Sequence, residues 1–408
     1  MKEILKQSSW LIGAQILSRI IGFFYTIFLA RNLGVSDYGL FSVGLAYFSI
    51  ISSFSDFGFN RYLIKEASQK ENTKWELLWN LMALRLTLIC IFFGIFSVLL
   101  YLFDGNRLRV SVILLASLAV LPQTIAITFD GLFIALRKLQ FSAIALITSS
   151  LGTVLLGFFM ISKGFGVIGA VNALILGQFL FVLTFVYLLY RKLGFKSSQI
   201  GILVIKKALV GSLPYGLLGI LGLLYFRIDT VLLSYLRGNF ETGIYGAAYK
   251  FFEAITFIPA ALSTALFPVL AKLHDVNQEQ VIKLYFKSLK ILFTISLLVV
   301  IGYFYLLPII IQLLLPSYLP AVKAIVILTL AIPFMFCHYP AVQVLLSTDK
   351  YFKPVITISI ILLSLNIVLN LIFIPIYGFI AASWITVFSE ALSFLIYFRF
   401  LRVKVFKK

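Results

Sequence analysis

The sequence has few charged residues, and this scarcity excludes most classes of soluble protein. Asp, Glu, Lys and Arg make up 12% of the 408 residues, whereas an average soluble domain carries about 25%. Hydrophobic residues make up 62% of the chain. The composition therefore predicts a polytopic integral membrane protein.

Cysteine and histidine are also scarce, with two residues of each. Cys90 and Cys337 lie in apolar runs, so we expect small buried hydrophobes and no disulfide. His274 and His338 have no Cys, Asp or Glu at ligand spacing, which argues against a metal site. The sequence contains neither a Walker loop nor a catalytic constellation. It therefore predicts no enzyme, no cofactor and no internal ATP motor.

Long apolar runs dominate what is present, and a bilayer core needs about 20 apolar residues per helix. Twelve runs are long enough to span, and turn signals such as Asp104-Gly105 separate them. The expected spans are residues 9–30, 38–60, 80–103, 110–134, 140–162, 166–190, 208–236, 243–270, 285–310, 321–346, 355–376 and 378–400.

The net charge of +19 is a signal of topology and not of nucleic-acid binding. In the twelve-span interpretation, 24 Lys and Arg residues lie on the side of the termini and 6 on the opposite side. Positively charged loops stay in the cytoplasm. We therefore predict that both termini are cytoplasmic, with the basic loops near anionic lipid headgroups.

The two halves of the chain resemble each other. Residues 34–41 match residues 238–245 at an offset of 204, and residues 166–170 match residues 378–382 at an offset of 212. Such a duplication with six spans per half predicts two lobes related by a parallel pseudo-two-fold, with a central cavity. The expected domains are an N-terminal lobe over residues 1–190, a cytoplasmic linker over 191–207 and a C-terminal lobe over 208–408.

Several polar side chains fall deep inside the expected spans, where charge is costly. Gln15 and Arg19 share one helical face, as do Arg227 and Thr230. Arg19 and Arg227 have no opposite charge one turn away on their own helices. The candidate substrate-binding residues are Gln15, Arg19, Arg227, Thr230 and Lys250. The candidates for ion coupling are Asp56, Asp130, Asp229, Glu253 and Glu390.

Simpler interpretations compete with these roles. Arg85 lies near the cytoplasmic end of its span and is expected to extend its guanidinium to the interface. Lys250 and Glu253 are one turn apart and could neutralise each other. Asp229 could bond a neighbouring helix. Two further acids could each pair with an arginine at the inner face, as Asp56 with Arg61 and Asp130 with Arg137.

The motifs resemble a known family. Ser18-Arg19-Ile-Ile-Gly22-Phe23 and Leu29-Ala-Arg-Asn-Leu-Gly34 look like the opening of the polysaccharide flippases of the Wzx type. Pro214-Tyr-Gly216 and Arg227-Ile-Asp229 resemble the start of that family's second half. The superfamily also includes multidrug and toxin extruders and lipid II flippases. The lipid II branch usually has a further Arg where this chain has Tyr25, and it commonly carries fourteen spans.

The resemblance implies a flippase for a polyprenyl-linked oligosaccharide used in surface polysaccharide such as O-antigen, capsule or exopolysaccharide. Its partners would be the lipid-linked glycan, membrane lipids and glycan assembly proteins of the pathway, without nucleic acid. The implied location is the inner or plasma membrane. A cation-coupled drug extruder is the alternative, although its site would favour acids over arginines. A membrane-embedded glycan polymerase or ligase fits less well, because the loops are short.

The predicted topology can be tested by labelling single cysteines in intact cells. We expect a cysteine at Ser198 to react only with membrane-permeant reagents and a cysteine at Asn239 to react from outside. Labelling of position 239 only from the cytoplasm would contradict the orientation.

Overall fold

The structure is a computed structural model that describes residues 2–69, 73–194, 196–274 and 276–406. Every regular element among these residues is helical, and none of them lies in a strand, which confirms the prediction of an all-α protein. Lys70, Lys407 and Lys408 contribute to the predicted charge asymmetry and lie outside the described residues.

The chain forms two compact units, Met1–Arg227 and Ile228–Lys408. The boundary falls inside helix α8 (Ile202–Ala254). The other helices of unit 1 are α1 (Lys2–Asp56), α2 (Phe59–Gln69), α3 (Lys74–Phe103), α4 (Arg107–Leu118), α5 (Val120–Ala135), α6 (Leu139–Ser162) and α7 (Gly166–Lys192). Those of unit 2 are α9 (Phe257–Leu273), α10 (Gln278–Leu314), α11 (Ala321–Thr329), α12 (Ile332–Leu346) and α13 (Phe352–Lys404), with short 3-10 helices at Pro316–Tyr318 and Asp349–Tyr351.

The described helices are long and apolar enough to cross a bilayer. Eight continuous segments qualify, and the bent pair α11–α12 makes a ninth. Three of the nine, Ser9–Gln69, Ile202–Leu273 and Asp349–Lys404, contain 61, 72 and 56 residues. At 1.5 Å per residue even the shortest would extend about 80 Å, far beyond a hydrocarbon core of about 30 Å. Each must therefore turn back.

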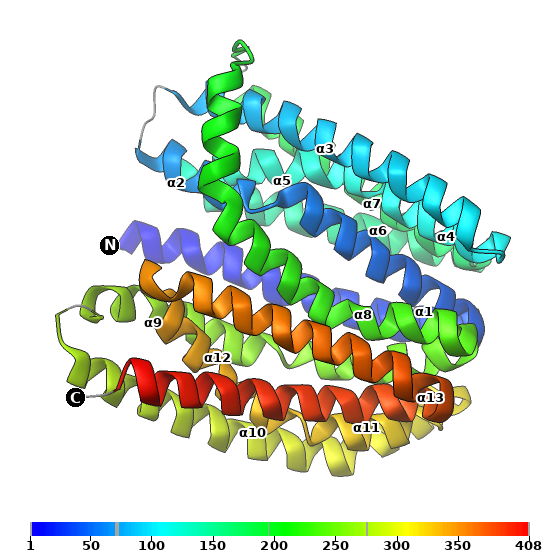
Figure 1. The fold of residues 1–408 in the computed structure, drawn as a ribbon. Coiled ribbons are helices and arrows are strands. Elements are labelled where there is room, and N and C mark those ends of the chain that lie inside the picture. Colours follow the sequence, from blue (N-terminus) through cyan, green and yellow to red (C-terminus); the bar gives the residue numbers. More distant parts are fainter. Residues whose placement is uncertain (1, 70–72, 195, 275, 407–408) are drawn as a thin grey trace. The chain divides into compact units, whose positions relative to one another are not determined.

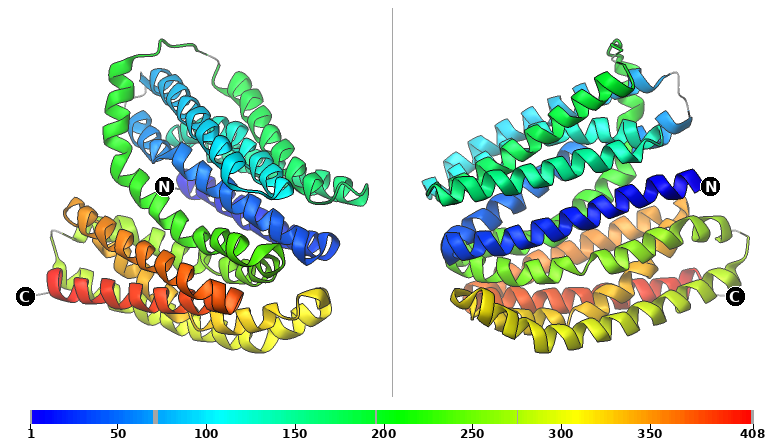
Figure 2. Two further views of the ribbon diagram at one scale, coloured as in Figure 1. Left: turned by 45° about the vertical axis from the view of Figure 1, so that its right-hand side comes forward. Right: turned by 180° about the vertical axis from the view of Figure 1, so that it is seen from behind.

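A glycine makes each of these turns. The backbone leaves helical geometry at Gly34 (φ 75°, ψ 171°), Gly238 (φ 82°, ψ −175°) and Gly378 (φ 57°, ψ −138°). A side chain is strained in these regions, whereas glycine adopts them freely. Figures 1 and 2 show α1 and α13 each doubling back on itself. With the three long segments divided at these glycines, the described chain has the twelve expected spans.

The same glycines support the predicted duplication. Gly34 and Gly238 are matched at the offset of 204 and have nearly the same backbone angles. Gly166 and Gly378, matched at the offset of 212, have φ values of 56° and 57°. Equivalent residues in the two halves therefore perform the same local task.

The segment predicted to be a linker is fixed to α3 inside unit 1. The Trp79 indole donates a hydrogen bond to the Lys196 carbonyl at 2.8 Å. The fully buried Asn80 amide donates to the Gln199 carbonyl at 3.2 Å and accepts from the Gly201 amide at 2.7 Å. These bonds set where the chain enters α8. The predicted domain borders themselves stay a prediction.

The outer surface confirms the apolar character of the helices. Large exposed side chains on α3 include Ile95, Leu99 and Leu102, which in a bilayer would face hydrocarbon. Cys90 on the same helix is also exposed, so the prediction that both cysteines are buried is wrong for this residue. A thiol is apolar enough for this surface because it is only a weak hydrogen-bond donor. Cys337 is buried as predicted.

The turn at Gly34 can be tested by mutation. No atom lies within 4 Å of the position that a Cβ would occupy there, so Gly34→Ala would act through backbone strain alone. We expect a loss of about 1–3 kcal/mol of stability, seen as a lower unfolding temperature in detergent. Gly302→Ala is the matched control, because Gly302 lies inside α10 with equal free space. Equal unfolding temperatures for the two variants would contradict the analysis.

Candidate functional site

A polar cavity lies in unit 1 and contains Arg19. Its volume is about 410 Å³. Arg19 and Gln15 line it from α1, and Asp130 lines it from α5. The remaining walls come from α1, α5, α6 and α7, through Leu11, Ser18, Ile134, Ser142, Leu146 and Phe181. The structure thus brings two of the predicted substrate-binding residues into one cavity with an acid predicted for ion coupling.

A second cavity of about 260 Å³ adjoins the first. The two share Ser18, Leu146 and Phe181 as lining residues. Its own walls carry hydroxyl and amide groups, from Tyr25, Gln123, Ser149, Ser150, Thr153 and Gln178. We call the two cavities together the unit 1 cavity.

The wall of the unit 1 cavity contains polar atoms without hydrogen-bond partners among the described residues. They are Ser18 Oγ, Tyr25 OH, Asp130 Oδ1, Ser142 Oγ and Gln178 Oε1. A buried polar atom left unsatisfied costs about 1–3 kcal/mol, so most such atoms in proteins have a partner. All five belong to residues that line the cavity, so this part of unit 1 is rich in polar side chains.

The face of α1 predicted from residue spacing is confirmed in part. Gln15, Arg19 and Gly22 all line the unit 1 cavity. Thr26, one turn after Gly22, donates its hydroxyl to the Gly22 carbonyl at 2.8 Å. This bond satisfies the hydroxyl within the helix, as threonine hydroxyls in apolar helices commonly do.

Arg19 and Asp130 are the charged residues of this cavity. In the described part of the chain Arg19 has no ion pair, and its side chain is exposed. No ion pair joins Asp130 to Arg137 in the described structure, so the competing interpretation of Asp130 is wrong. Asp130 lines the cavity from α5, and Arg19 lines it from α1. The cavity can thus present a cationic fork and a carboxylate to the same ligand.

Arg85 is the clearest correction to the sequence analysis. Its guanidinium does not extend to the interface but is 1% exposed and lies 3.2 Å from the Asp56 carboxylate. Asp56 therefore pairs with Arg85 on α3, and Arg61 lies over the Tyr215 ring instead. Spacing within one helix could not reveal this pair, because the partner comes from a different helix.

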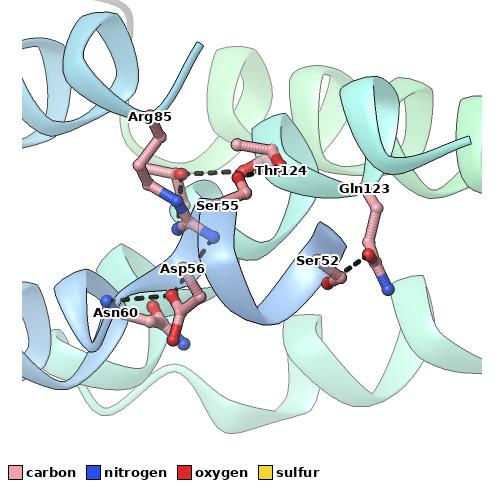
Figure 3. A network of polar contacts seen from close by, with 8 residues as sticks. Ser52, Ser55, Asp56, Asn60, Arg85, Gln123 and Thr124 are labelled. Atoms are coloured by element: carbon pink, nitrogen blue, oxygen red, sulfur yellow. Dashed lines mark hydrogen bonds and ion pairs between the residues drawn. The ribbon is translucent and has the colours of Figure 1, made fainter. Parts of the chain in front are cut away.

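Hydrogen bonds surround this ion pair (Figure 3). Arg85 donates to the Thr128 hydroxyl at 2.9 Å, and the backbone N–H of Asn60 donates to the Asp56 carboxylate at 3.2 Å. The Ser52 hydroxyl donates to the Gln123 side chain at 2.7 Å. Gln123 also lines the unit 1 cavity. The paired Asp56 thus has a structural role next to the cavity, and the structure does not place it in the cavity wall.

Asp229 is bonded to neighbouring helices, as one interpretation predicted. It accepts hydrogen bonds from Asn370 at 2.8 Å and from Thr386 and Tyr245 at 3.1 Å each. All of these residues belong to unit 2, and Asp229 is 4% exposed. Thr230, its neighbour on α8, is buried as well. Asp229 stays a candidate for ion coupling, because hydroxyl and amide groups surround its carboxylate.

The remaining candidates have separate environments. Lys250 and Glu253 form the predicted pair at 3.3 Å and are both about one-third exposed. Arg227 is half-buried and makes a contact of its own. It does not line the cavity that contains Arg19, so its role in substrate binding stays a prediction.

Glu390 has a partner that the sequence analysis missed. The His338 imidazole of α12 approaches its carboxylate to 3.0 Å. The analysis also missed Tyr25, Gln123 and the hydroxyl groups of α6 as cavity residues. The sequence marks such residues only as polar positions inside apolar runs. Most polar residues in these runs bond the backbone of their own helix, and spacing does not distinguish them from residues that line a cavity.

Loss of the Arg85 guanidinium should destabilise unit 1. Removing one member of a buried ion pair typically costs about 3–5 kcal/mol, so we expect Arg85→Ala to lower the unfolding temperature strongly. The double variant Asp56→Asn/Arg85→Gln should recover part of the loss, because no charge is left unpaired. Arg107→Ala, at an exposed position of α4, is the control. A stable Arg85→Ala protein would show that the pair has little structural importance.

Known structures share this fold. The lipid II flippase MurJ in an inward closed conformation aligns at TM-score 0.76 with 17% identity, covering 97% of this chain and 87% of that chain. An inward-facing multidrug resistance MATE transporter of the MOP superfamily aligns at 0.71 with 16% identity and coverage of 95% and 94%. A MOP superfamily transporter from Pyrococcus furiosus aligns at 0.64 with 16% identity, covering 99% and 95%.

Sequence comparisons agree with the fold. An uncharacterized membrane protein of Methanocaldococcus jannaschii is 23% identical over 420 residues, covering 98% of this chain and 99% of that protein. The MatE family model matches residues 214–372. The model of the polysaccharide biosynthesis protein family matches residues 4–274, about two-thirds of the chain. This all-helical membrane chain, with its polar cavity, therefore belongs to the polysaccharide biosynthesis protein family.

Proposed function

We propose that this protein moves a polyprenyl-(pyro)phosphate-linked oligosaccharide from the cytoplasmic to the outer leaflet by alternating access, for surface polysaccharide biosynthesis. The family match and the flippase fold support transport of a lipid-linked saccharide. The observation that carries the proposal is the unit 1 cavity, which is lined by Arg19 and by hydroxyl and amide side chains of α1, α5, α6 and α7. Such a wall suits a ligand that is both anionic and rich in hydroxyl groups.

Arg19 is the proposed contact for the phosphate. A guanidinium is planar and carries parallel N–H groups, so it can bind two phosphate oxygens at once. Because it lines the cavity without an ion pair among the described residues, its charge is available to a ligand. Gln15, one turn earlier on α1, adds an amide that can donate to the same oxygens.

The adjoining part of the cavity suits the sugar. Amide groups of Gln123 and Gln178 and the hydroxyl group of Ser150 can donate to and accept from saccharide hydroxyls. The volume of this part, about 260 Å³, is small and suits a compact polar group. We therefore place one sugar residue next to the phosphate and not a whole oligosaccharide.

The predicted roles of the other charged residues form part of the proposal. Arg227, Lys250 and Thr230 would contact the substrate at a later stage of transport. Asp229 and Glu253 stay candidates for ion coupling. Both termini would be cytoplasmic in the plasma or inner membrane, and the lipid-linked glycan, membrane lipids and glycan assembly proteins would be the partners.

The membrane potential can supply part of the driving force. It is worth about 2.3 kcal/mol per charge per 100 mV. A headgroup with about two negative charges would gain about 4–5 kcal/mol per 100 mV on moving outward, if its charge is not compensated. An inside-negative potential therefore favours export of an anionic headgroup.

A cation-coupled drug extruder is the second candidate function. Asp130 in the cavity wall and the partial MatE match favour it, because a carboxylate attracts cationic compounds. The two candidate functions can be distinguished, because each would be lost on substitution of a different residue. The flippase depends on Arg19, whereas the extruder depends on Asp130 and not on Arg19.

We expect Arg19→Ala to reduce lipid-linked glycan transport by about 10- to 150-fold, since a hydrogen bond to a charged group is worth about 1.5–3 kcal/mol. Arg19→Lys should recover part of the activity, because it keeps the charge but loses the fork. The measurement is the movement of a fluorescent short-chain polyprenyl pyrophosphate bearing N-acetylglucosamine between the leaflets of proteoliposomes. Arg137→Ala, in an exposed turn, is the control.

A second probe separates sugar from phosphate recognition. Gln178→Leu should slow the sugar-bearing probe and leave the same polyprenyl pyrophosphate without sugar unaffected. Normal transport of the sugar-bearing probe by both Arg19→Ala and Gln178→Leu would contradict the proposed site. Loss of ethidium efflux in Asp130→Asn cells, with normal probe transport in Arg19→Ala, would favour the extruder.

A further inference from the structure

Unit 2 contains a buried acid–base pair that the proposed function does not use. Glu390, on the second part of α13, and His338, on α12, approach to 3.0 Å between Oε2 and Nδ1. The side chain of Glu390 is 1% exposed and that of His338 is 16% exposed. Neither of these two atoms has a hydrogen-bond partner among the described residues, so the electrostatic contact between them is the main interaction of both.

This pair differs in kind from Asp56–Arg85 of unit 1. Arginine stays protonated in proteins, so the unit 1 pair keeps its charges. Histidine is the side chain that changes charge near neutral pH. A charged pair of imidazolium and carboxylate is neutral as a whole. Release of one proton leaves a neutral imidazole beside a buried carboxylate, and uptake of one proton leaves an imidazolium beside a neutral carboxylic acid.

Either change alters the free energy of the contact between α12 and α13. The charged pair is attractive in a medium of low dielectric constant, whereas a lone buried charge is strongly destabilised. His338 is the more exposed member, so it is the member better placed to exchange the proton. The protonation state of the pair is therefore linked to how closely α12 packs on α13.

The helices around the pair can respond to such a change. Pro340 lies inside α12, two residues after His338, and a proline cannot donate the helical backbone hydrogen bond. The helix pair α11–α12 is bent by 46°. A helix interrupted at both places has fewer backbone bonds that hold its position, so side-chain contacts such as His338–Glu390 have more influence on it.

The pair also lies on a polar stripe along α13. Thr386, Glu390, Ser393 and Tyr397 follow a spacing of four, three and four residues, which places them on one helical face, and all four are buried. Thr386 bonds Asp229 at 3.1 Å at one end of this stripe. Tyr397 and the Ser359 hydroxyl are 3.1 Å apart at the other end. The stripe connects the pair to other polar groups inside unit 2.

Other titratable or charged groups lie beside the pair or on the helices that pack against α12 and α13. The rings of Tyr339 and Tyr397 lie 5.1 Å and 6.5 Å from the imidazole between centroids. The further groups on the packed helices are Cys337 of α12, Tyr285 and Lys290 of α10, Lys272 of α9, Lys323 of α11 and Asp229 of α8. The tyrosines, the thiol and the lysines ordinarily titrate well above neutral pH, and the Asp229 carboxylate is enclosed by its own hydrogen bonds.

We propose that His338 and Glu390 form a reversible proton-binding site that links the protonation of unit 2 to the packing of α12 against α13. Proton binding is a property of the protein alone. Its use in transport rests on the proposed function, so the two parts are tested separately.

The first experiment measures protonation of the imidazole directly. The chain has only two histidines, so His274→Gln leaves His338 as the single signal in protein labelled with ¹⁵N-histidine. We expect this signal to titrate between pH 5 and 9 in nanodiscs. Glu390→Gln should change the midpoint, because it removes the carboxylate that lies 3.0 Å from the imidazole.

Two results would overturn the site. One is an imidazole that keeps a single protonation state over the whole range, and the other is an equal midpoint with and without the carboxylate. If Glu390→Gln does not fold, Glu390→Asp replaces it. The shorter side chain holds its carboxylate farther from the imidazole, so the change in the midpoint should be smaller.

The second experiment measures whether transport uses the site. The sugar-bearing probe is followed in proteoliposomes at a series of pH values. We expect the rate in the His274→Gln protein to follow the His338 titration, and the rate in His338→Gln to lose this dependence. An unchanged pH profile in His338→Gln would overturn the link to transport. If no protein moves the probe, the proposed function fails, and the titration still decides the proton site.

Discussion

The cost of a charge inside an apolar helix bundle explains most of the polar architecture of this protein. A charged side chain in the bilayer core is destabilising by several kcal/mol or more, so each must be paired, bonded, hydrated or bound. Asp56 is paired with Arg85, Asp229 is bonded by three donors, and Arg19 lines a cavity. The same physical demand thus produces a structural pair, a bonded acid and an open site.

The backbone obeys a related constraint. Hydrocarbon offers no hydrogen-bond partners, so the chain crosses it as helices that satisfy their own backbone. Reversal then needs a residue with access to positive φ, and glycine supplies it at positions 34, 238 and 378. Many polar side chains follow the same rule. The Ser49 hydroxyl, for example, donates to the Leu45 carbonyl of its own helix at 2.8 Å. A hydroxyl bonded in this way cannot donate the same proton to a ligand.

The two halves have kept a common pattern of turns and acquired different chemistry. At the offset of 212, Gln178 of unit 1 corresponds to Glu390 of unit 2. Gln178 lines the unit 1 cavity, whereas Glu390 lies against an imidazole. An uncharged amide suits recognition of a polar ligand, and a carboxylate beside a histidine suits proton exchange. Duplication followed by such exchanges would divide substrate recognition and protonation between the units.

The sequence by itself determined the membrane class, the helical spans, the turning glycines and the family resemblance. Each depends on local properties, namely hydropathy over about 20 residues, backbone freedom at glycine and short motifs. It also placed Gln15 and Arg19 on one face of α1, because helical spacing is local. It did not determine the surroundings of Asp56, Asp130 and Glu390. The prediction that the Arg85 guanidinium extends to the membrane interface was wrong. Those outcomes depend on which helices pack together. When a side chain contacts another helix, the residues near it in the sequence do not identify its partner. Only the tertiary structure joined Asp56 to Arg85, gathered α1, α5, α6 and α7 around one cavity, and brought His338 to Glu390.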